Sequence, residues 1–113
     1  MDVSRRASSI CCTCSAAGDS HIGRLRFAAC VADEATQIVE PDLMIPLTLG
    51  PRVLVMFGDH KQLGPVVRSR RAAQGGLGLS LFERRVQSGI EPELLDTQYR
   101  MHPSLSTYPS RRF

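Results

Sequence analysis

The 113-residue sequence contains a single lysine, Lys61, and no tryptophan. A P-loop of the form G-x-x-x-x-G-K-[ST] holds nucleotide phosphates with its backbone N–H groups and its lysine. Because Lys61 lies between His60 and Gln62, the sequence has no Gly-Lys pair and therefore no P-loop. It also lacks a long apolar run, so we expect no transmembrane helix and no membrane partner. The N-terminus lacks the apolar region of a secretion signal.

The remaining composition is that of a globular protein. Hydrophobic residues make up 42% of the sequence, and 14 basic against 11 acidic residues give a net charge of +3. The arginines gather in small clusters that could hold phosphates, although solvated surface arginines explain such clusters as well. These clusters are Arg68, Arg70 and Arg71; Arg84 and Arg85; and Arg111 and Arg112.

The first half of the sequence predicts alternating strands and helices. The stretch "SSICCTC" (8–14) is predicted to be a short strand with reduced thiols. A zinc site built from these cysteines and His21 is the less favoured alternative, because zinc modules use two C-x₂-C pairs and the sequence has only the Cys11–Cys14 spacing. The stretches "RLRFAACVA" (24–32) and "RVLVMF" (52–57) are apolar enough for buried parallel strands. Between them, Pro41 starts a short helix that Gly50 ends, which completes a βαβ unit.

The second half predicts a loop, a helix and the start of a further unit. The helix "SLFERRVQSG" (80–89) has Ser80 as its N-cap and Glu83 as a capping-box partner. A strand is expected in "EPELLDT" (91–97), followed by a short helix that begins near Pro103. We therefore expect two domains, residues 1–89 and 90–113.

Carboxylates follow both predicted strands of the βαβ unit. Asp33 and Glu34 come after the first strand, and Asp59 follows the second. Ligands of parallel α/β sheets bind beyond the carboxyl ends of the strands, so these acids should meet at one edge. An apolar strand that ends in Asp-Glu is typical of the Walker B element, which holds Mg²⁺ through a carboxylate. A helix N-cap explains such an acid about as well.

Three ordered motifs, "DEATQ", "GDHKQLGP" and "QYRMHP", give the sequence a close resemblance to a known family. Together with "ICCTCSAAGD", "EPDLMIPLTLG" and "GLSLFERRV", they resemble superfamily 1 helicases of the up-frameshift type, the regulators of nonsense transcripts. The resemblance covers nearly the whole sequence and keeps the order of the family.

The resemblance implies a role for each matching position. Asp33 would hold Mg²⁺ through water, and Glu34 would align and deprotonate the attacking water. Gln62 would touch the γ-phosphate or that water, since an amide can both donate and accept. Arg100 would reach the γ-phosphate and Tyr99 would stack on the base or ribose. Without the resemblance, Gln62 as a loop residue, Tyr99 as a core residue and Arg100 as a surface residue would be simpler explanations.

The family also implies a fold and an activity. The fold class would be α/β, with a partial RecA-like parallel sheet that lacks the P-loop strand of the P-loop NTPase fold, plus the start of a second RecA-like domain. The chain would be a fragment of a cytoplasmic ATP-dependent RNA helicase of nonsense-mediated mRNA decay, with ATP and Mg²⁺ as cofactors and decay factors as partners. RNA would be the nucleic acid, with single-stranded DNA as the alternative. Candidate RNA contacts are residues 14–19 and 65–71.

Two other classes of function remain open. The chain could be a non-catalytic helicase remnant that binds RNA or a protein, in keeping with the missing P-loop. It could also be a small metal-dependent hydrolase that uses Asp33, Asp59, His60 and His102. In each case, we expect the isolated chain to be inactive as an ATPase.

Overall fold

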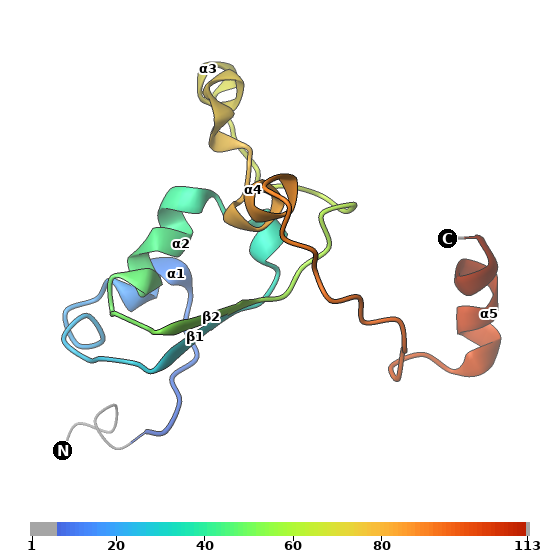
Figure 1. Ribbon diagram of the computed structural model, residues 1–113, viewed down its shortest axis with the longest axis horizontal. Helices are drawn as coiled ribbons and strands as arrows, with labels where there is room; N and C mark the ends of the chain where they lie inside the picture. The colour runs from blue at the N-terminus through green and yellow to red at the C-terminus, as the bar shows by residue number, and fades with distance from the viewer. Residues whose placement is uncertain (1–6, 113) are drawn as a thin grey trace.

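Two short parallel strands form the sheet in the computed structural model, which describes residues 7–112 (Figure 1). Strand β1 (Ala29–Ala32) pairs with β2 (Val53–Met56), with Ala29 opposite Val53 and Ala32 opposite Met56. This pairing confirms the predicted βαβ unit. The helical elements of the described residues are α1 (Cys14–Ala17), η2 (Ala35–Gln37), α2 (Glu40–Leu47), α3 (Arg70–Ala72), η3 (Ala73–Leu77), α4 (Leu81–Gln87) and α5 (Pro103–Arg112).

Helix α2 forms the crossover between the strands, as the sequence predicts. Pro41 lies in its first turn, where a missing N–H costs nothing, and Glu40 and Asp42 place negative charge at the positive end of the helix dipole. Gly50 follows the helix with φ +76°, a backbone conformation that favours glycine. The chain therefore turns back directly into β2.

Two predicted strands are wrong. Residues 8–13 form no regular structure, and Thr13 instead caps α1, its hydroxyl accepting from the N–H of Ala16 at 3.2 Å. Residues 90–99 are likewise not a strand. A strand needs a neighbour to take its backbone hydrogen bonds, and the described part of the chain supplies none at either place.

One face of the sheet is covered and the other is open. In Figure 1, α1 and α2 lie over the same face of β1 and β2. Leu54 and Met56 pack against the core on that side, whereas Val31 and Val53 are 65% and 53% exposed. The strands thus alternate between buried and exposed residues, unlike the doubly covered strands that the sequence predicted.

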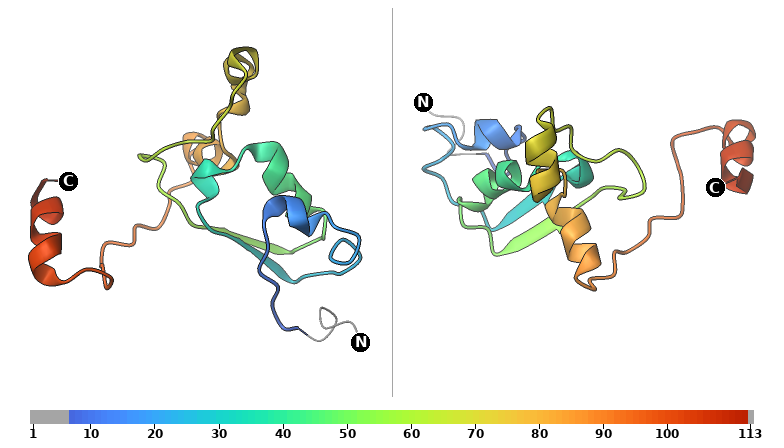
Figure 2. Two further views of the ribbon diagram at one scale, coloured as in Figure 1. Left: turned by 180° about the vertical axis from the view of Figure 1, so that it is seen from behind. Right: turned by 90° about the horizontal axis from the view of Figure 1, so that it is seen from above.

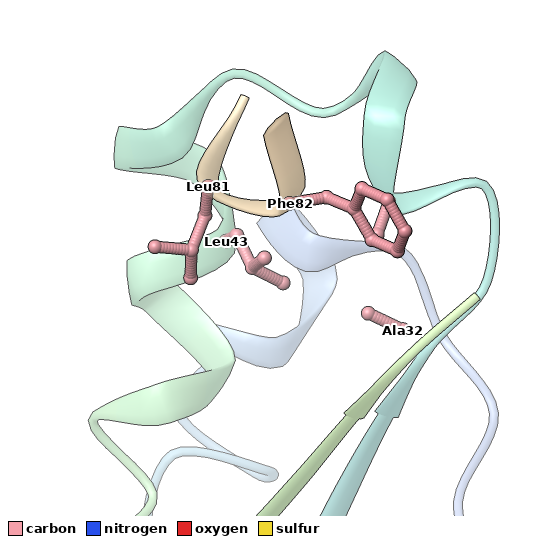
Figure 3. Close-up of a cluster of buried hydrophobic side chains, with 5 residues drawn as sticks. Ala32, Leu43, Leu81 and Phe82 are labelled. Atoms are coloured by element: carbon pink, nitrogen blue, oxygen red, sulfur yellow. The ribbon is translucent and has the colours of Figure 1, made fainter. Parts of the chain in front are cut away.

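A small hydrophobic core joins the sheet to the helices. Figure 3 shows Leu43 of α2 beside Leu81 and Phe82 of α4, with Ala32 at the end of β1 below them. Helix α4 begins at the predicted N-cap, where the Ser80 hydroxyl accepts from the N–H of Glu83 at 3.1 Å. Burial and capping together hold α4 against the βαβ unit.

Replacing Leu43 by alanine is expected to remove most of the stability of the folded unit. Leu43 is fully buried, with 0% exposure, and a buried Leu→Ala change costs about 2–5 kcal/mol. Urea unfolding followed by circular dichroism measures the loss. The matched control is Leu105→Ala in α5, where the side chain is 67% exposed and the change should be nearly neutral. Equal effects of both substitutions would contradict the assigned core.

The chain exposes more surface than a compact domain of its size. Its accessible area is 9438 Å² and its mass is 12.4 kDa, for which about 6,100 Å² is typical of a folded monomer. Figure 2 shows the reason: residues 90–102 run away from the body, and α5 stands apart from it. We therefore expect the isolated chain to be marginally stable, and a cooperative melt at high temperature would contradict this.

An ion pair links the start of α2 to the last turn of α4. The Arg84 guanidinium donates from Nε to Glu40 Oε2 at 2.8 Å, and its Nη2 donates to the second carboxylate oxygen. Hydrogen bonding to Arg84, followed by the charge of that guanidinium, lowers the pKa of Glu40. The two hydrogen bonds join α2 to α4 through one bidentate pair of partly exposed side chains.

The Glu40–Arg84 pair should make stability depend on pH. An unfolded glutamate titrates near pH 4.3, and the folded pKa is lower, so the stabilisation is complete above about pH 4.3. It is lost as the pH falls through the folded pKa. We expect Arg84→Gln to lower the urea midpoint at neutral pH and the difference from wild type to vanish at acidic pH. Arg71→Gln on exposed α3 is the control, and a difference unaffected by pH would contradict the assignment.

Candidate functional site

The predicted acid pair lies at the carboxyl end of β1. The β1–β2 ladder continues past the strands: the N–H of Phe57 donates to Ala32 O at 2.8 Å, and the N–H of Ala35 donates to Phe57 O at 2.7 Å. Asp33 and Glu34 lie within this loop and are exposed. Because the strands are parallel, the loop after β2 leaves from the same edge, as the sequence predicted.

Glu34 has an unusual backbone conformation. With φ 51° and ψ 38°, it is the one non-glycine residue with positive φ in residues 7–112. Such a conformation costs of order 1–3 kcal/mol, and strained residues of this kind cluster at functional sites. Its carboxylate accepts from Gln37 Nε2 at 3.2 Å.

The alternative role of the acids, helix capping, is wrong for Glu34. Glu34 occupies the N-cap position of η2, yet its side chain makes no capping hydrogen bond. Among the residues that the structure describes, Asp33 Oδ1 accepts from the adjacent N–H of Glu34, at 3.1 Å, and from no other donor. The two carboxylates are thus exposed, and that of Glu34 contacts the Gln37 side chain of η2 without capping the helix backbone.

Asp33 has the chemistry that a hydrated Mg²⁺ requires. One carboxylate oxygen is used by the N–H of Glu34, and Oδ2 has no partner within residues 7–112. Mg²⁺ keeps most of its waters and binds one or two carboxylates together with substrate phosphates. The exposed carboxylate of Asp33 fits this pattern.

The loop after β2 packs directly on the loop after β1. A Cβ atom on Gly58 would lie 3.0 Å from Thr36 Cγ2 and 3.1 Å from the Thr36 backbone N, so a larger residue would push the two loops apart. Thr36 is 4% exposed. Close packing at Gly58 therefore holds the start of the loop that carries Asp59 and Gln62 against the loop that carries the acid pair.

A tight turn follows Gly58. The carboxylate of Asp59 accepts from the N–H of Lys61 and from Gln62 Nε2, each at 2.9 Å. These two hydrogen bonds, that of Lys61 being the larger cause, lower the pKa of Asp59. The sequence analysis did not predict that Asp59 would bind the Gln62 side chain. An aspartate that begins a turn commonly accepts a hydrogen bond from the backbone two residues later, as Asp59 does from Lys61.

Tyr99 and Arg100 lie far from the acids. They belong to the extended segment between α4 and α5 (Figure 1), and Tyr99 is 92% exposed. The N–H of Arg100 donates to Gln98 Oε1 at 3.0 Å, which shapes the turn before α5. The structure places Asp33 and Glu34 in one loop and Gln62 in the other loop at the same edge of the sheet, and leaves Tyr99 and Arg100 in a separate segment.

The candidate RNA contacts differ in exposure. Within residues 14–19, Cys14 packs on the core, and burial is the main cause that raises the pKa of its thiol. Residues 65–71 lead into α3, which stands out from the body in Figure 1 and exposes Arg68, Arg70 and Arg71. Of the two segments, the arginine-bearing one is the better placed for a phosphate backbone.

The residues of the suggested metal-dependent hydrolase do not come together. Within residues 7–112, no three His, Cys, Asp or Glu side chains are arranged to hold a metal ion. His102 lies beside α5, where its Nδ1 is 2.7 Å from Ser104 Oγ.

Within residues 7–112, no helix is long and apolar enough to span a membrane.

Comparison with known proteins shows the family. Two families described as AAA domain match residues 2–70 and 77–113. The chain is 52% identical over 104 residues to "Regulator of nonsense transcripts 1 homolog" of Drosophila melanogaster, which covers 92% of the chain and 9% of that relative. It is 51% identical over 109 residues to "ATP-dependent helicase upf1" of Schizosaccharomyces pombe, covering 96% of the chain and 12% of the relative.

The two-stranded parallel sheet and the acids at its edge are consistent with part of a P-loop NTPase domain, which is the class that the AAA matches define. Within that class, the chain belongs to the superfamily 1 helicases of the up-frameshift type, the regulators of nonsense transcripts. "ATP-dependent helicase NAM7" of Saccharomyces cerevisiae is 44% identical over 112 residues, 99% of the chain and 11% of the relative. The chain spans about a tenth of the length of these curated relatives.

Proposed function

We propose that the chain supplies the water-activating part of an ATP-dependent RNA helicase that acts in nonsense-mediated mRNA decay. The observation that supports the proposal is that the loops after β1 and β2, which carry Asp33 and Glu34 and carry Gln62, leave the parallel sheet at one edge and are hydrogen-bonded and closely packed at Phe57 and Gly58. About half-identical relatives named as ATP-dependent helicases support the same activity.

Each residue at this edge has a distinct part in ATP hydrolysis. Asp33 holds Mg²⁺ through water, and bound Mg²⁺ supplies charge that neutralises the phosphates. Glu34 aligns and deprotonates the attacking water, a role suited to a carboxylate held away from helix-capping contacts. Gln62 contacts the water or the γ-phosphate through its amide.

The second group of residues acts from a separate domain. We divide the chain into residues 1–89, from the first RecA-like domain, and residues 90–113, from the start of the second. In this division the extended segment is the linker, and closure of the two domains carries Tyr99 to the nucleotide base or ribose and Arg100 to the γ-phosphate.

The partners follow from the family. We propose RNA as the nucleic acid, with single-stranded DNA as the alternative, and nonsense-mediated decay factors as protein partners in the cytoplasm. The arginines at 68–71 are exposed and suit a phosphate backbone, whose binding depends on charge rather than on base identity.

The test uses the chain alone and within a helicase. The isolated 113-residue chain, which contains no P-loop, is expected to show no ATPase activity. A chimera in which this sequence replaces the matching segment of the S. pombe relative is expected to hydrolyse ATP when RNA is present. This protein is called the chimeric helicase below. A folded chimera that binds RNA but never hydrolyses ATP would favour the non-catalytic binding module instead.

A further inference from the structure

The turn after β2 fixes the side chain of Gln62. Gln62 Nε2 donates to Asp59 Oδ2 at 2.9 Å, while the N–H of Lys61 donates to Asp59 Oδ1 at 2.9 Å. The backbone N–H of Gln62 closes the turn by donating to Asp59 O at 3.1 Å. Asp59 thus holds both the backbone and the side-chain amide of Gln62.

This arrangement decides which end of the amide is free. A side-chain amide has two N–H donors and one carbonyl acceptor, and Asp59 binds the donor end. Asp59 takes one of the two N–H donors, and Gln62 Oε1 accepts no hydrogen bond from any of residues 7–112, so the carbonyl is the end of the amide that has no partner. A carbonyl oxygen accepts from water but cannot accept from a phosphate oxygen, which is itself an acceptor.

Contacts with α4 and with the loop after β1 also hold the turn that contains Asp59 and Gln62. The His60 ring stacks on Phe82, with the ring centroids 6.3 Å apart and the planes at 25°. Phe82 is 8% exposed and belongs to the core, and Gly58 rests on buried Thr36 at the other end of the turn. Supports on both sides limit how far Asp59 and Gln62 can move relative to the acid pair.

We propose that Asp59 is a positioning residue for ATP hydrolysis, which holds the amide of Gln62 with its carbonyl oxygen directed at the attacking water. Gln62 then shares the water with Glu34, which takes the proton, while Asp59 touches neither water nor nucleotide. This inference rests on the proposed function, because it assigns a geometry to the water that Glu34 activates.

A double-mutant cycle in the chimeric helicase tests the inference. Asp59→Ala should lower kcat by roughly 10²-fold, the typical loss when a reacting group is misplaced by about 1 Å, with little change in KM or nucleotide affinity. Gln62→Ala should have a similar effect, and the double variant should be no slower than Gln62→Ala alone. Asp59→Asn, which keeps an acceptor oxygen at the same place, should fall between Asp59→Ala and the unsubstituted protein.

Lys61→Ala is the matched control, because it keeps the backbone N–H that binds Asp59 and should leave kcat unchanged. Losses from Asp59→Ala and Gln62→Ala that multiply in the double variant would overturn the inference, as would an unchanged kcat for Asp59→Ala. Failure of the proposed function itself would appear separately, as unimpaired turnover in Glu34→Gln.

Discussion

Replacing Arg100 by alanine in the chimeric helicase is expected to slow ATP turnover by about 10³–10⁵-fold, the loss seen when a transition-state arginine is removed from related phosphoryl-transfer enzymes. The guanidinium would stabilise charge that develops on the transferring phosphoryl group, and this charge exists mainly in the transition state. Nucleotide affinity should therefore change much less than turnover. Steady-state ATPase rates with saturating RNA, alongside separately measured nucleotide affinity, distinguish the two.

Two further substitutions sharpen this prediction. Arg100→Lys keeps a positive charge but loses the planar fork that binds two oxygens, so its turnover should lie between those of Arg100→Ala and the unsubstituted protein. Arg111→Ala in α5 removes another exposed arginine of residues 90–113 and should leave turnover unchanged. An equal loss in Arg100→Ala and Arg111→Ala would show that general positive charge, and not the position of Arg100, is what matters.

The sequence predicts those parts of the fold that local contacts determine. The apolar stretches around β1 and β2, the proline at the start of α2 and the glycine after it give the parallel pair directly. Ser80 identifies the start of α4, because its capping hydrogen bond is made to a residue three positions away. The edge that carries Asp33 and Asp59 then follows from the parallel arrangement alone.

The two failed strands have a common physical cause. Residues 8–13 and 91–97 have the composition of strands, but strand formation requires hydrogen-bonding neighbours that are distant in sequence. Local propensity contains no information on such neighbours. Thr13 then makes the contact that is available, as the N-cap of α1, and residues 91–97 stay extended and exposed.

The sequence identifies Asp33, Glu34 and Gln62, but not how they are held. The left-handed backbone of Glu34 arises because the loop must reach Phe57 O through the N–H of Ala35, a contact between segments more than 20 residues apart. Likewise, the support of the Gln62 turn by Phe82 depends on how α4 packs. Such tertiary contacts determine orientation, which motifs alone do not describe.

Replacing Glu34 by glutamine in the chimeric helicase is expected to reduce ATP turnover by about 10²–10⁴-fold, the typical contribution of a general base. The amide keeps the size of the side chain and leaves Asp33 to hold Mg²⁺, so nucleotide should still bind. Glutamine can orient a water but cannot take its proton at neutral pH. The measurement is again steady-state ATPase with RNA, together with nucleotide affinity.

A companion variant separates chemistry from backbone strain at this position. Glu34→Gly removes the same carboxylate but suits a φ of 51°, so it should lose turnover while folding at least as stably as the unsubstituted protein. Glu34→Gln should lose turnover with no gain in stability, because the left-handed backbone remains occupied by a residue with a Cβ. If Glu34→Gln kept turnover near that of the unsubstituted protein, the carboxylate would not be the base, and the assignment of "VADEATQ" as a Walker B element would be wrong.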